Sequence, residues 1–455
     1  MERKQKIGLN MTEGSILKTL LVFAVPILLT NLIQQLYNTV DLIIIGKFVG
    51  NEGTVGVSTG GDLINFITML SIGFSSAGQV YVSQQVGARD YDNLKKTIGT
   101  LLSVMMGASL VFAAVGAIVA EPFLRMMNCP EEAFSQAVDY MRITCIGAPF
   151  IYGYNAVCGI LRGMGESKRP MIFVIIAAVS NIIMDLLFVV AFRMEAAGTA
   201  LATIIAQFAS FAAAFVFMYR KREHFDFDFK LSSFKIHKKP LLVLLRLGIP
   251  RALQSSLINV SLLFCSSRIN AFGIIASATN SVGNKVTRFA NIITQSVDTG
   301  AATMIGQNLG ARKNDRAKKT VHVALAIALG VAAVNSLAAI FAPRLIFSIF
   351  TNDPEVIEFG VTFMHISIIT FILAAVMGPY QAMITGSGNA SLGFLVGILD
   401  GVVLRIGLSL LFGELMGMGV VGYFYGNALP RLAPCIIGIV YFYTKAWEKR
   451  RLLTE

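Results

Sequence analysis

The sequence predicts an all-α polytopic membrane protein, with twelve transmembrane helices in two six-helix bundles related by pseudo-two-fold symmetry. The chain has 455 residues, of which 55% are hydrophobic and 14% charged, and its mean hydropathy is +0.68. That composition is typical of membrane proteins rather than soluble ones. Apolar runs of roughly 20 residues, the length a helix needs to cross a bilayer, recur along the whole chain. The two halves of the chain also repeat each other.

Twelve apolar runs define the predicted spans. They are 17–45, 57–82, 98–119, 134–160, 171–192, 198–219, 241–268, 278–305, 320–341, 355–382, 392–412 and 419–443. Basic residues concentrate in both terminal tails and in alternate loops, whereas acids such as Glu52, Glu131 and Asp353 occupy the other loops. By the positive-inside rule, both termini are predicted to be cytoplasmic, in a plasma (inner) membrane. This topology explains the net charge of +12, so we expect no nucleic-acid partner.

A motif in the first half returns about 223 residues later. Ser83–Thr97, SQQVGARDYDNLKKT, aligns with Gly306–Thr320, GQNLGARKNDRAKKT. The same offset relates three further landmarks: Pro26 with Pro250, Pro130 with Pro354, and Gly163-x-Gly165 with Gly386-x-Gly388. Two repeats of six helices have the same orientation and are related by an axis along the membrane normal.

The repeat sets the predicted domains. An N-terminal bundle covers 1–219, a cytoplasmic linker 220–240, and a C-terminal bundle 241–455. The linker alternates Phe and Asp between lysines, which fits a segment lying against lipid headgroups or a plain solvated linker. Two bundles joined by one linker can rock against each other, as alternating access requires.

The most informative stretch is Pro26–Asp41 in the first span. Its polar residues recur every three to four positions, which places them on one helical face opposite an apolar face. They are Asn31, Gln34, Gln35, Asn38 and Asp41. A carboxylate at membrane depth is by default a functional-site hypothesis; the alternative is that Asp41 meets a polar partner and joins two helices. Pro26 is a predicted hinge, because proline removes a helix hydrogen bond.

A second carboxylate, Asp185, occurs in the fifth span, and Asn181 lies one helical turn before it. The equivalent positions in the second repeat fall near Cys265 and Leu408. We therefore expect a cation-coupling site in the N-terminal bundle alone. The cation is either a proton or Na⁺, because Asp41, Asp185, Asn181 and Thr203 also offer oxygen ligands.

Asp62 and Lys285 occupy corresponding places in the two repeats. We hypothesise that they form an ion pair between the lobes when the outer side closes. The alternative is that they are separate cavity-lining charges.

Nothing in the sequence indicates an enzyme or a resident cofactor. The four histidines have no metal-ligand spacing, and Gly163-Met164-Gly165 lacks the strand that a phosphate-binding loop would follow.

Taken together, these features resemble the multidrug and toxic compound extrusion (MATE) transporters, over essentially the whole chain. The resemblance rests on the twelve spans, the doubled Gln-x-x-Gly-Ala-Arg motif, and the helix from Pro26 to Asp41. Within the family the chain is similar to the DinF-like branch. That likeness implies a coupling site at Asp41, Asn181 and Asp185 with Thr203, and cavity positions at Gln34, Tyr37 and Asn155. Asn38, on the polar face of the first span with Gln34, is a further predicted cavity position.

The resemblance implies cation-coupled export of amphipathic, often cationic, compounds by an antiporter, which we expect to be a monomer. A flippase for a lipid-linked saccharide is the alternative, since it shares the two-bundle fold. We expect a flippase cleft to be rich in arginine, whereas the N-terminal candidate site is rich in amides and acids.

Overall fold

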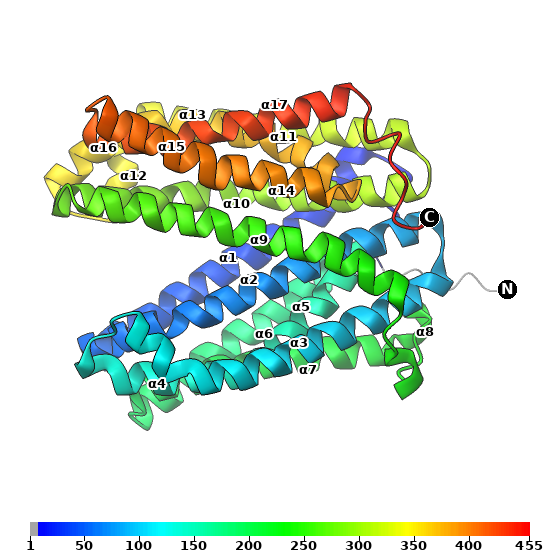
Figure 1. Cartoon of the computed structure of the whole chain (residues 1–455), viewed down its shortest axis with the longest axis horizontal. Coiled ribbons are helices and arrows are strands. Elements are labelled where there is room, and N and C mark those ends of the chain that lie inside the picture. Colours follow the sequence, from blue (N-terminus) through cyan, green and yellow to red (C-terminus); the bar gives the residue numbers. More distant parts are fainter. Residues whose placement is uncertain (1–7) are drawn as a thin grey trace. The chain divides into compact units, whose positions relative to one another are not determined.

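The computed structural model describes residues 8–455, apart from the side chains of Leu42 and Asn51. Arg3, Lys4 and Lys6, on which the predicted orientation partly depends, lie outside the described residues. Figure 1 shows helices along the chain, and no strand occurs between residues 8 and 455. The predicted all-α class is therefore confirmed.

The first half of the chain runs from α1 to η2. Its elements are α1 (Ile16–Phe48), α2 (Gly50–Ala88), α3 (Tyr91–Met126), α4 (Glu131–Ile146), α5 (Ala148–Gly163), α6 (Lys168–Asp185), the π-helical turn η1 (Leu186–Ala191), α7 (Glu195–Arg220), α8 (Arg222–Phe225) and η2 (Leu231–Phe234).

The second half runs from α9 to α17. Its elements are α9 (Lys238–Asn270), α10 (Ile274–Gly310), α11 (Asn314–Phe341), α12 (Pro343–Ser348), α13 (Pro354–Gly386), α14 (Ala390–Ile398), η3 (Leu399–Leu404), α15 (Arg405–Leu410), η4 (Leu411–Leu415), α16 (Gly419–Ala428), η5 (Leu429–Arg431) and α17 (Leu432–Tyr443).

All twelve predicted spans coincide with helices. In the described chain, nine spans are long and apolar enough to cross a membrane, and α4 and α5, bent by 44°, make a tenth. The eighth predicted span falls on α10, whose 37 residues include the charged Lys285, Arg288 and Asp298. The twelfth is divided at Pro430 into the shorter helices α16 and α17. The charged residues lower the hydropathy of α10, and Pro430 makes the last span less continuous.

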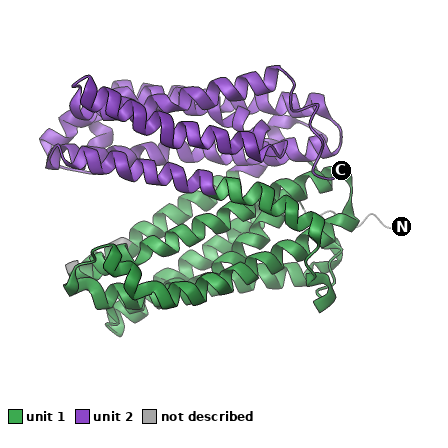
Figure 2. Cartoon of the chain, viewed as in Figure 1, with its two compact units in different colours: residues 1–10, 25–252 green, residues 11–24, 253–455 purple. Residues whose placement is uncertain are grey.

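The chain forms two compact units, coloured separately in Figure 2. Unit 1 holds Val25–Ala252 and the segment that ends at Asn10; unit 2 holds Met11–Ala24 and Leu253–Glu455. Helices α1 and α9 are therefore each divided between the units. The division falls just before Pro26 in α1 and just after Pro250 in α9.

The doubled Gly-Ala-Arg motif ends a helix in the same way in both repeats. Arg89 follows α2 and Arg312 follows α10, and both have a left-handed φ of 57°. The backbone N–H of Arg89 bonds back to the carbonyl of Val86 at 3.2 Å, and that of Arg312 to Leu309 at 2.9 Å. These bonds satisfy carbonyls that the helix end leaves free.

The paired glycine motifs also have matching geometry. Gly165 and Gly388 have φ values of 87° and 73°, which glycine adopts without a Cβ penalty. Two residues earlier, Gly163 and Gly386 pack so closely that an added Cβ would lie 2.7 and 2.8 Å from a backbone carbonyl of α2 and α10, respectively. The sequence repeat is thus also a repeat of local structure.

The linker packs on unit 1. Phe225 and Phe227 are buried, and the ring of Phe227 lies 5.3 Å from that of Phe234. The Ser103 hydroxyl of α3 donates a 2.6 Å hydrogen bond to the Phe234 carbonyl. Asp226 and Asp228 point to solvent instead. The alternation therefore separates a buried phenylalanine face from an exposed acidic face.

Asp228 stabilises the fold of the linker itself. The Ser233 hydroxyl donates a hydrogen bond to its carboxylate, and this bond, with one from the Lys230 backbone N–H, lowers the pKa of Asp228.

The segment before α1 is fastened within unit 2 by side chains of the second Gly-Ala-Arg region. Arg316 donates hydrogen bonds to the carbonyls of Met11, Glu13 and Gly14, at 3.1, 2.7 and 2.8 Å. Asn308 donates to the Met11 carbonyl as well, at 3.1 Å. The Met11 side chain is buried, so the segment is held by packing and by polar bonds.

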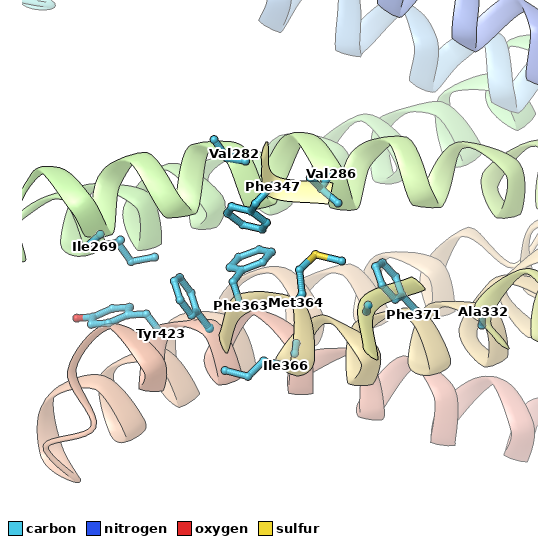
Figure 3. Packing of buried hydrophobic residues seen from close by; sticks show 14 of the residues in the cluster. Ile269, Val282, Val286, Ala332, Phe347, Phe363, Met364, Ile366, Phe371 and Tyr423 are labelled. Atoms are coloured by element: carbon cyan, nitrogen blue, oxygen red, sulfur yellow. The ribbon is translucent and has the colours of Figure 1, made fainter. Parts of the chain in front are cut away.

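Each unit has a close-packed apolar core. In unit 2 the core gathers aromatic and aliphatic side chains from α9 to α16, among them Phe347 and Phe363 (Figure 3). The ring of Phe363 packs edge to face against those of Phe347 and Phe424, at centroid distances of 6.2 and 4.9 Å. A smaller cluster in unit 1 packs Ile45 of α1 against Tyr140 of α4 and Ala200 of α7.

Candidate functional site

The polar face of α1 leads from Pro26 to Asp41. The helix continues through Pro26, and the Thr30 hydroxyl donates a 2.7 Å hydrogen bond to the Pro26 carbonyl. A threonine bonded to the carbonyl four residues back tends to bend a helix, as does the proline itself. Gln34 and Tyr37 are half-buried, whereas Asn38 is exposed.

Two carboxylates come together within unit 1. The carboxyl group of Asp41 on α1 lies in hydrogen-bonding contact with that of Asp185, the last residue of α6. Asp185 is fully buried. Like charges this close repel strongly in a medium of low dielectric constant, so the pair requires a proton or another cation to compensate it.

Several oxygens at this site have no protein donor. Among the described residues, no N–H or O–H donates to Asp41 Oδ1, to either oxygen of Asp185, or to Asn181 Oδ1. Asn181 is buried one turn before Asp185 on α6, as its spacing predicts. Unsatisfied buried acceptors are costly, so a cluster of them indicates a site for a proton or a positively charged ligand.

Two tyrosines are close to the acid pair. Tyr37 and Tyr140 both lie within range of the Asp41 charge, and Tyr140 also lies within range of Asp185. Tyr37 precedes Asp41 by one helical turn. Tyr140 was not predicted as a site residue, because it follows the polar start of α4. The one signal in the sequence was the tyrosine itself, since a buried tyrosine hydroxyl needs a polar partner.

The remaining predicted positions are placed as follows. Thr203 is half-buried on α7, one turn after Thr199, whose fully buried hydroxyl has no partner among the described residues. Asn155 is half-buried on α5, and its backbone carbonyl accepts a 2.6 Å hydrogen bond from Ser75. Thr199 was missed because a threonine in an alanine-rich helix resembles ordinary packing.

Asp62 on α2 and Lys285 on α10 are both exposed, and they belong to different units. Their predicted ion pair stays a prediction. Across residues 8–455, no three His, Cys, Asp or Glu side chains gather in a metal-binding cluster.

Comparison with known proteins covers nearly the whole chain. The MatE family model matches residues 26–187 and again 250–411, so each repeat is matched separately. A probable multidrug resistance protein of Bacillus subtilis, YpnP, is 27% identical over 453 residues, covering 98% of this chain and 99% of the relative. A second one, YoeA, is 25% identical over 446 residues, covering 97% and 96%. The multidrug export protein MepA of Staphylococcus aureus is 21% identical over 395 residues, covering 86% of each.

Solved structures share the fold. An outward-facing multidrug resistance MATE family transporter superposes with a TM-score of 0.91 at 21% identity, covering 98% of this chain and 100% of the other. A transporter of the same superfamily from Pyrococcus furiosus, described as having a binding pocket of reverse polarity, gives a TM-score of 0.90 at 21% identity and the same coverage. Helical membrane architecture, the doubled repeat and both family matches agree: the chain belongs to the MatE family of multidrug efflux transporters, which are transporters and not enzymes.

Proposed function

We propose that the protein is a cation-coupled antiporter that exports amphipathic, often cationic, compounds by alternating access across the plasma membrane. The observation that carries this proposal is the pairing of half-buried Asp41 with fully buried Asp185, with three carboxylate oxygens that no described protein group satisfies. A proton shared by the two carboxyl groups would satisfy them. Na⁺ would do so with Asn181 Oδ1 as a further oxygen ligand, since hard cations take oxygen ligands.

The site also connects coupling to motion. Asp41 and Pro26 lie on the same helix, and α1 is divided between the units immediately before Pro26. Cation uptake at Asp41 can therefore change the bend of α1 at Pro26 and the state of the cavity face that carries Gln34 and Tyr37. The driving energy is adequate, because one charge moving through 100 mV supplies about 2.3 kcal/mol.

The decisive experiment uses proteoliposomes that contain a cationic dye. Dye movement is measured for wild type and Asp41→Asn under a proton gradient, and separately under a sodium gradient. We expect one gradient to drive the wild type, and Asp41→Asn to lose driven transport while it still binds dye. Normal transport by the variant would show that Asp41 is not the coupling site. If neither gradient moves the dye in the wild type, the flippase alternative should be assayed next.

A further inference from the structure

A second buried polar site lies in unit 2, and the acid pair plays no part in it. Arg405, only 3% exposed, donates a 2.9 Å hydrogen bond from Nη2 to Asp400 Oδ1. Its Nη1 donates to the Asn427 carbonyl at 3.4 Å, and Arg431 Nη1 donates to the same carbonyl at 3.1 Å. Two guanidinium groups thus converge on one carbonyl oxygen, and the one carboxylate beside them, Asp400, forms its direct ion pair with Arg405.

A π-helical turn produces this arrangement. Asp400 lies in η3, and Arg405 is the first residue after η3. Residues five positions apart differ by about 140° around an α-helix and face different sides. The wider π turn, closed by i→i+5 bonds, brings them onto one face, and such turns are frequent at functional sites.

A cavity of about 60 Å³ adjoins the two arginines. Its other polar lining comes from three further elements and includes Thr287 of α10, Ser367 and Thr370 of α13, and Asn427 of α16. Phe363 and Ile366, which line the same cavity, belong to the apolar core in Figure 3. Charges beside that core interact strongly, because the surrounding dielectric constant is low.

The cavity has positive charge and unused donors. No acidic side chain is among the described residues that line it. Arg405 Nε and the Thr287 hydroxyl are buried without a hydrogen-bond partner in the part of the chain that the structure describes. Two positive charges beside one negative charge leave an excess positive charge next to the apolar core, which is unfavourable unless it is compensated, and guanidinium and hydroxyl groups both donate to anions.

From these observations we propose that the cavity between Arg405, Arg431 and Thr287 binds one small monovalent anion of the size of chloride. The charge matches, since Arg405, Arg431 and Asp400 leave one positive charge to neutralise. The size also matches, because drug-sized ligands occupy cavities of roughly 300 Å³ or more, whereas about 60 Å³ accommodates an ion that can replace water there. The bound anion stabilises the helix pairs of unit 2 and does not depend on the coupling cation of unit 1.

The test measures binding of radioactive chloride to the purified full-length protein in lipid nanodiscs, without a gradient and in sodium-free buffer at constant pH. We expect saturable binding of one chloride per chain, and competition by bromide but not by gluconate. Arg431→Gln should weaken binding about tenfold or more, because a charge-assisted hydrogen bond contributes on that scale. Thr287→Val, which keeps the side-chain shape and removes only the hydroxyl, should weaken it several-fold.

A matched control is Arg268→Gln. Arg268 is an arginine of the same unit that pairs with Glu414 and does not line the cavity, so its removal should leave chloride binding unchanged. If Arg431→Gln fails to fold, Thr287→Val decides the matter. No chloride binding by the wild type would show that the cavity holds only water, and normal binding by both folded cavity variants would place the anion elsewhere. Neither result bears on the Asp41 transport assay.

Discussion

The carboxyl group of Asp185 at the end of α6 meets that of Asp41 on α1, and no described protein donor satisfies either oxygen of Asp185. Two groups in such contact behave as one unit, so substitutions at them should not be additive. We expect Asp41→Asn and Asp185→Asn each to abolish cation-driven dye export, and the double variant to be no worse than either. Initial export rates in proteoliposomes measure this. Asp139→Asn, which removes an exposed carboxylate of α4, is the control and should export normally. Additive partial losses would mean that the two acids act separately.

Tyr140 gives a second test of the same site. Tyr140→Phe removes a hydroxyl beside the acid pair and keeps the ring that packs on Ile45 and Ala200. We expect the cation concentration at half-maximal transport to shift by about threefold, with little loss of thermal stability, because the hydroxyl dipole acts on the acid charges from nearby without a hydrogen bond to them. The control is Tyr152→Phe, whose hydroxyl donates a 2.8 Å bond to the Ile67 carbonyl. It should lower stability by about 1 kcal/mol and leave the cation dependence unchanged.

The attachment of the linker depends on Gly99 of α3. An added Cβ there would lie 1.9 Å from the Ser233 carbonyl. Gly99→Ala should therefore displace residues 231–237 and speed both proteolysis and amide exchange in that segment. Gly107 lies on the same helix with no atom within 4 Å of its Cβ position, so Gly107→Ala should leave both rates unchanged. Equal rates in the two variants would mean that the linker is not held at Gly99.

Arg316 is expected to hold the segment before α1. Arg316→Ala removes three hydrogen bonds to the carbonyls of Met11, Glu13 and Gly14. Amide exchange in residues 11–15 should accelerate about tenfold or more, because bonds from a charged donor contribute more than neutral ones. Lys319→Ala removes an exposed charge from the same helix and serves as the control. Unchanged exchange in Arg316→Ala would assign the attachment to Met11 packing and to the remaining hydrogen bonds from Asn308 and Lys313.

Hydropathy and internal repetition were sufficient to predict the long helices and their order, but not the short helices α8 and α12 or the break between α4 and α5. Every predicted span falls on a helix, because bilayer-length apolar runs leave few alternatives. The i, i+4 spacing also placed Asn181 beside Asp185 on one face of α6. What could not be predicted depends on tertiary contacts. No local pattern reports the π turn that joins Asp400 to Arg405, the packing of Phe227 on unit 1, or the position of Tyr140 beside Asp41.

The division of α1 and α9 between the units has a consequence for the chain as a polypeptide. Cutting it in the linker would give two fragments, and neither would contain a whole unit. The first fragment would carry Met11–Ala24 away from unit 2, and the second would carry residues 238–252 away from unit 1. Unit 1 would then lack the first turns of α9, and unit 2 would lack the first turns of α1, because each of these segments is on the other fragment. Separately synthesised halves should fold fully only as a complementing pair, even though each has six spans and its own family match.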